Sequence, residues 1–141
     1  MSTVDSAIAA IQDIVLASSD VTIKVAPDYP ISDATAFPIV ITHLVAGEAN
    51  GNNATTTQFL NTASVDVHFA RINLKDTYQK IDAVAVEFPR RLHGNPTLSG
   101  AVDTIYFPVT FAVSPAEWNG VVTQMLSFQV TFKTLETPIS S

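Results

Sequence analysis

Two segments of the chain place apolar residues at the three-to-four-residue spacing of one helix face. The first is 4–15, where Val4, Ile8, Ile11 and Val15 form the stripe, and the second is 74–88, which begins at Leu74. Ser2 or Thr3 can cap the first helix. Pro89 is expected to kink or stop the second helix, because proline cannot donate a backbone hydrogen bond inside it.

Five other segments alternate apolar and polar residues, the pattern of a strand with one buried face. They are 21–25, 37–44, 59–69, 105–113 and 126–132. The alternation is longest in 59–69, where the even positions from Leu60 to His68 are mostly polar. Such a split predicts an antiparallel sheet with one face in water.

The order of these elements predicts an α+β fold with a mainly antiparallel sheet and two helices packed on one face. The length of 141 residues fits one domain, 1–141, and the chain shows no internal repeat or linker. A polar stretch, 46–56, contains Asn50-Gly51 and predicts a projecting, mobile loop. A second loop is expected at 114–120, between the last two strands.

The composition indicates what kind of surface the protein has and which partners it can bind. Apolar residues make up 47% of the chain and charged residues 14%, whereas about 25% is usual in soluble domains. The shortage of charge indicates either a surface covered by partner chains or one rich in Thr, Ser and Asn. A net charge of −6 argues against tight binding to nucleic acid, which requires Lys and Arg.

Cysteine is absent, which excludes disulfides and thiolate metal sites and suits a reducing cytoplasm. The N-terminus lacks the basic stretch of a secretory signal, and no apolar run approaches the ~20 residues that span a bilayer. We therefore expect a soluble protein with no membrane partner.

The search for chemistry finds no catalytic, metal or cofactor site. Ser64, Asp66 and His68 are the residue types of a hydrolase triad, but neighbours on one strand face lie about 6.5–7 Å apart. A triad needs contacts of about 2.6–3.2 Å. The other histidines, His43 and His93, form no ligand spacing, and no phosphate-binding motif is present. We therefore expect no enzyme activity and no cofactor.

Two features carry both a structural and a functional interpretation. Arg90-Arg91 can complement the C-terminus of its helix, or it can contact an acidic neighbouring subunit or a passing nucleic acid. Trp118 can fold back over the core or serve as an interface anchor, a frequent role of tryptophan.

Two short motifs are the most specific parts of the chain. They are Phe37-Pro38-Ile39-Val40-Ile41, with Gly47-Glu48 shortly after, and Asn95-Pro96-Thr97-Leu98-Ser99-Gly100 after the second helix. In these motifs, and over nearly the whole chain as an order of elements, the sequence resembles the tail terminator proteins of long-tailed bacteriophages.

The resemblance implies a homo-oligomeric ring, in that family a hexamer, which caps the tail tube and joins the tail to the head. Its partners would be the tail tube protein and a head-tail connector or head-completion protein. Genomic DNA would pass through the channel without sequence-specific binding. The protein would be assembled in the host cytoplasm and reside in the tail or neck of the virion.

A ring subunit needs two different contact patches. The candidate interface residues are Gly47, Glu48, Asn50, Asn52, Asn53, Arg90, Arg91, Trp118 and Asn119. The alternative functions are another neck component, such as a tail-completion or head-completion protein, a small-ligand-binding α+β module, and an enzyme whose site is assembled from distant residues.

Overall fold

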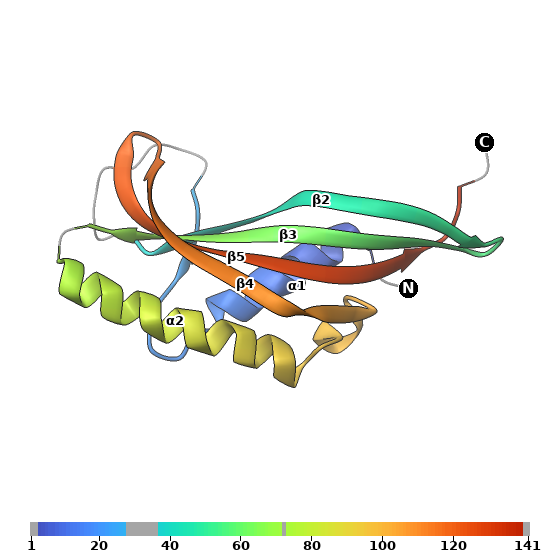
Figure 1. Cartoon of the computed structure of the whole chain (residues 1–141), viewed down its shortest axis with the longest axis horizontal. Helices are drawn as coiled ribbons and strands as arrows, with labels where there is room; N and C mark the ends of the chain where they lie inside the picture. Colours follow the sequence, from blue (N-terminus) through green and yellow to red (C-terminus); the bar gives the residue numbers. More distant parts are fainter. Residues whose placement is uncertain (1–2, 28–36, 72, 140–141) are drawn as a thin grey trace.

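The computed structural model describes residues 3–27, 37–71 and 73–139 (Figure 1). Among these residues, two α-helices, a 3₁₀ turn and five strands follow one another along the chain. In order they are α1 (Val4–Leu16), β1 (Lys24–Val25), β2 (Ile39–Asn53), β3 (Thr56–Ala70), α2 (Leu74–Gly94), η2 (Leu98–Gly100), β4 (Thr104–Trp118) and β5 (Val121–Glu136).

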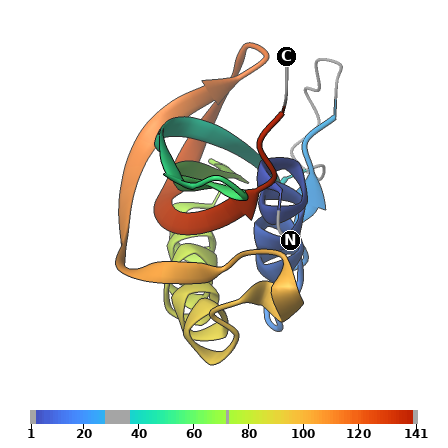
Figure 2. The same ribbon diagram turned by 90° about the vertical axis from the view of Figure 1, so that its right-hand side faces the viewer.

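The five strands form one sheet in the order β1-β2-β3-β5-β4. The short β1 is parallel to β2, and every other pair is antiparallel. Both helices lie on the same face of the sheet (Figures 1 and 2). The predicted α+β fold, with a mainly antiparallel sheet, is therefore confirmed.

The core lies between the helices and one face of the two inner strands, β3 and β5. Alternate residues of β3, including Val65 and Val67, point into it, as do Phe128 and Phe132 of β5. The helices contribute Ala7, Ile11, Val15, Ile81, Val84, Phe88 and Leu92. Since side chains alternate along a strand, the intervening residues of β3 and β5 face away from the helices.

The loop expected at 46–56 is wrong, because β2 and β3 form one long hairpin. Asn50 pairs with Gln58 and Gly51 with Thr57, so both lie within the ladder. The chain reverses at 54–55 instead. There the side-chain carbonyl of Asn53 accepts hydrogen bonds from the backbone N–H and hydroxyl of Thr55 at 2.9 and 2.8 Å. This Asx-type turn needs no glycine.

The loop expected at 114–120 is also wrong. β4 continues to Trp118, and only Asn119 and Gly120 separate it from β5. Both have positive φ angles, 48° and 86°, as a two-residue type I′ hairpin turn requires. The hairpin end bends away from the helices (Figure 1).

Helix α1 confirms its predicted extent and is capped by Thr3, whose side chain accepts a hydrogen bond from the backbone of Ser6. Helix α2 does not stop at Pro89 and runs on to Gly94. Its buried stripe is Thr77, Ile81, Val84, Phe88 and Leu92, whereas Leu74 and Tyr78 are exposed. Of the strand expected at 21–25, only Lys24–Val25 pairs, although Val21 and Ile23 are buried.

Candidate assembly surface

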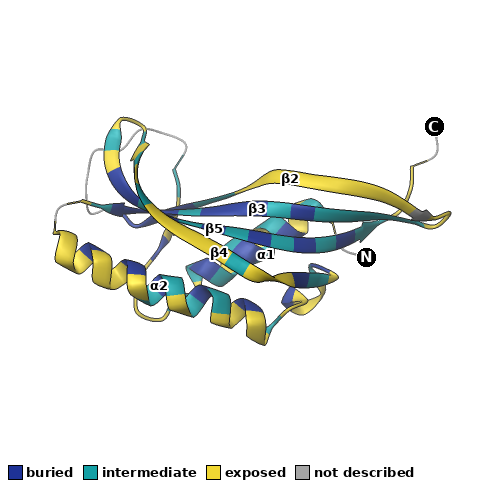
Figure 3. Cartoon of the chain, in the orientation of Figure 1, coloured by how far each residue is buried: buried dark blue, intermediate teal, exposed yellow. Residues whose placement is uncertain are grey.

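Both outer strands of the sheet present a long open edge. β1 pairs with β2 only at Ile39 and Val40. Within the described residues, no strand pairs with β2 beyond that point or with the outer side of β4. Positions 43–50 of β2 and most of β4 are exposed, while β3 and β5 between them alternate mainly between buried and intermediate residues (Figure 3).

These open edges carry exposed apolar side chains. On β2, Leu44 and Val45 are each 47% exposed. On β4, Tyr106, Phe107, Phe111 and Val113 are all exposed, Phe111 by 52%. Monomeric proteins usually protect sheet edges with charged residues, prolines, bulges or covering segments. Both strands contain irregularities in register and β4 contains two prolines, yet the exposed side chains beside them are apolar. Exposed aromatic side chains along an open strand edge are typical of an interaction surface.

Four of the candidate interface residues lie on β2, where the structure gives them different roles. Glu48 and Asn50 are exposed on the strand. Gly47 is a packing position, because a Cβ there would lie 3.1 Å from the Asn61 side chain. Asn53 holds the turn through its side chain. The side chain of Asn52 lies outside the described part of the structure.

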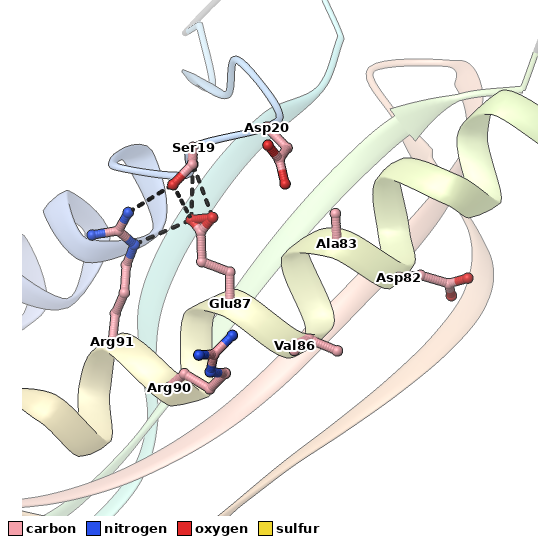
Figure 4. A pocket seen from close by; sticks show the side chains of 8 residues that line it. All are labelled: Ser19, Asp20, Asp82, Ala83, Val86, Glu87, Arg90 and Arg91. Carbon is pink, nitrogen blue, oxygen red and sulfur yellow. Dashed lines mark hydrogen bonds and ion pairs between the residues drawn. The ribbon is translucent and has the colours of Figure 1, made fainter.

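The two arginines of α2 separate into different environments (Figure 4). Arg91 is held within the chain by a contact other than the one expected at the helix C-terminus, because it donates to Glu87 at 3.1 Å and to the hydroxyl of Ser19 at 3.0 Å. Arg90 is exposed and forms no hydrogen bond or ion pair with any described residue. Only Arg90 therefore remains available for a contact outside the chain.

Glu87 joins α2 to the end of α1. The backbone N–H of Ser19 donates to its carboxylate oxygens at 2.9 and 2.8 Å. Desolvation alone would raise the pKa of Glu87, but the hydrogen bonds from Ser19 and Arg91 hold it below its usual range. The carboxylate is thus fixed as a link between the helices.

A groove of ≈ 760 Å³ runs beside this link, between α2 and the segment at Ser19 and Asp20 (Figure 4). Its volume is within the range of ligand pockets, about 300–1,000 Å³. However, the polar groups of Glu87, Arg91 and Ser19 bind one another, so they do not converge on a ligand. The other charged residues of the groove, Asp20, Asp82 and Arg90, lie outside this network.

Trp118 and Asn119 lie at the bent end of the β4–β5 hairpin. The Trp118 ring is half-buried, and its centroid lies 5.9 Å from that of His68 on the face away from the helices. It therefore covers the side of the sheet opposite the core. Its indole N–H is buried and finds no acceptor among the described residues. Asn119 forms the turn.

The face of the sheet opposite the helices is less wet than expected, because Ser64 and His68 are buried there. Asp66 accepts hydrogen bonds from Ser64 at 2.8 Å and Ser127 at 2.6 Å, and Gln129 donates to Ser64 at 3.1 Å. The network links β3 to β5.

This network does not have the geometry of a catalytic triad. His68 binds Thr123 at 2.8 Å instead of a serine, and His43 approaches the far oxygen of Asp66 at 3.8 Å. Among the described residues, no histidine is therefore hydrogen-bonded to a serine that it could activate. Burial lowers the pKa of His68, an effect that the negative charge of Asp66 partly offsets.

The described residues also contain no cluster of three or more His, Cys, Asp or Glu side chains that could hold a metal ion. No described helix is long and apolar enough to cross a membrane. Comparison with protein-family models gives no match, and no curated protein is significantly similar in sequence.

The exposed apolar residues on the open edges of β2 and β4 thus form a surface that the sequence does not predict. The alternation in 105–113 predicts a strand with one buried face, but β4 is an outer strand on which Ile105 is buried and Phe107, Phe111 and Val113 are exposed. No local signal distinguishes them from the residues of β5.

Proposed function

We propose that this chain is a structural subunit of a bacteriophage tail, a tail terminator that assembles into a ring at the head-proximal end of the tail tube. The observation that carries the proposal is the pair of open, apolar edges on opposite sides of one small sheet. A subunit of a closed ring needs such different patches on two sides, because its contacts are head-to-tail.

The sequence resemblance to tail terminators supports the same function. In this proposal the ring, a hexamer as in that family, ends tube polymerisation and contacts a head-tail connector or head-completion protein. The net charge of −6 suits a channel through which DNA slides without binding tightly.

The mass of the purified chain, measured by light scattering over a concentration series with and without tail tubes, tests the proposal. We expect a ring-sized species, or a monomer that forms one when tubes are added, and tubes that stop elongating. A chain that stays monomeric at every concentration and leaves tube elongation unchanged would refute it. A ring that binds only the head side would identify another neck component instead.

A further inference from the structure

Building on the proposed function, we infer that neighbouring subunits join edge to edge, with β4 of one copy pairing antiparallel with β2 of the next. The partner at each edge is thus a second copy of this chain. The interface is a continuation of the sheet and needs no cofactor.

The directions of the strands favour this pairing. β2, β3, β5 and β4 alternate in direction across the sheet, so the two outer strands run opposite to each other. A copy related by rotation about an axis along the strands therefore places its β2 antiparallel to β4. The alternation continues from one subunit to the next without a break, and the open backbone groups gain partners.

The side chains on the two edges match in character. Leu44 and Val45 of β2 are exposed, and so are Phe111 and Val113 of β4. Lysine and arginine are absent from both strands, and each carries one acid, Glu48 or Glu117. Like-charge repulsion between the edges is therefore small, and the apolar residues can be buried together.

The prolines of β4 limit where the pairing can occur. Pro108 and Pro115 lack a backbone N–H and border the segment 109–114. Pairing with a neighbour is thus expected within this segment, which contains Phe111 and Val113. On β2 the segment past Val40, where β1 ends, is open.

The position of the helices favours a closed ring over a flat ribbon. Both helices lie on one face (Figure 2), which makes the subunit thicker on that side. Repeated edge pairing then places the helices at larger radius and the other face toward the axis. That face presents hydroxyl and amide groups on the inner strands, namely Thr62, Ser64, Ser127, Gln129 and Thr131. On the inner strands, the charged groups of this face, Asp66 and Lys133, are engaged within the chain, while Glu48 of β2 is exposed there.

Two double variants test the pairing without assuming its register. Leu44→Lys with Val45→Lys blocks the β2 edge, and Phe111→Lys with Val113→Lys blocks the β4 edge. Leu74→Lys is the matched control, since Leu74 is exposed to a similar degree but lies on α2. Circular dichroism and thermal unfolding verify that each variant is folded, and light scattering gives its mass, with tail tubes added if wild type needs them.

We expect a ring for wild type and the control, monomers for each blocked variant alone, and a heterodimer when the two blocked variants are mixed. The mixture pairs because each variant retains the edge that the other has lost. Rings that persist in both blocked variants would overturn the edge pairing while leaving the proposed function intact. A homodimer of the β2-blocked variant would overturn it too, because it would indicate a two-fold β4–β4 contact. A wild-type chain that never assembles would refute both proposals.

Discussion

Phe111 and Phe128 are cross-strand neighbours with opposite environments. They are directly paired between β4 and β5, and their ring centroids lie 5.8 Å apart. Phe128 is completely buried, whereas Phe111 is 52% exposed. The inner strands β3 and β5 thus serve the fold of the single chain, while the outer strands β2 and β4 leave apolar area unused. The difference indicates that apolar content in an outer strand is available for association.

Replacing each of the two phenylalanines by alanine is the strongest test of this contrast. Phe128→Ala should lower the free energy of unfolding by about 3–5 kcal/mol, because it leaves a cavity in the core. Phe111→Ala should cost far less, since the side chain is already half in water, and should instead weaken assembly. Urea denaturation of monomeric protein measures both. Equal losses of stability would contradict the division between inner and outer strands.

The polar network on the other face of the inner strands gives a second test. Asp66→Ala should lower stability by about 1–3 kcal/mol, because the hydroxyls of Ser64 and Ser127 lose their shared acceptor. Glu48→Ala on the open edge of β2 is the control and should change the unfolding midpoint little. If both variants lose the same amount, the network does not bind β3 to β5.

The pH dependence of stability should report on His68 of β3. Its folded-state pKa is lowered by burial, so the unfolded chain binds the proton more tightly. The contribution of neutral His68 is fully present above the unfolded value of about 6.5 and is lost as the pH falls toward the lower, folded pKa. Urea midpoints between pH 7.5 and 5 should therefore decline more for wild type than for His68→Gln. Identical slopes would contradict buried, neutral His68.

The smallest effect is expected at the start of β4, where Lys133 and Asp103 form a partly exposed ion pair at 3.2 Å. Lys133→Met should cost at most about 1 kcal/mol, because surface ion pairs are weak and screened by salt. Thermal unfolding of both proteins at low and high salt measures this loss of stability. A larger loss would mean that the outer strand depends on this pair for its position.

Local sequence patterns predicted the elements better than their ends. The i, i+4 stripe predicts α1 and the alternation predicts β3 correctly, because each signal depends on periodicity within a few residues. The polar composition of 46–56 predicts a loop. This stretch is a strand because its partner, β3, continues beside it and satisfies its backbone. Polar composition alone could not reveal that partner.

The candidate surface was less predictable still. Phe111 and Phe128 stand in the same alternating pattern, and only the strand order decides which one is buried. Arg90 and Arg91 are adjacent in sequence, yet the position of Ser19, distant along the chain, engages only Arg91. Long-range packing sets these outcomes. The resemblance to tail terminators remains a prediction that the assembly experiments test.

The insertion of β5 between β3 and β4 has a consequence for folding during synthesis. Val65 pairs with Phe128, which is 63 positions later, so this edge of β3 stays unpaired until β5 has been made. Such long-range pairing closes slowly and exposes the unfinished sheet in the meantime. A nascent chain therefore has no completed edge at β4 to offer a neighbour. Pairing through β4 thus waits until the chain is nearly complete, whereas the unpaired edge of β3 is exposed to non-native association in the meantime.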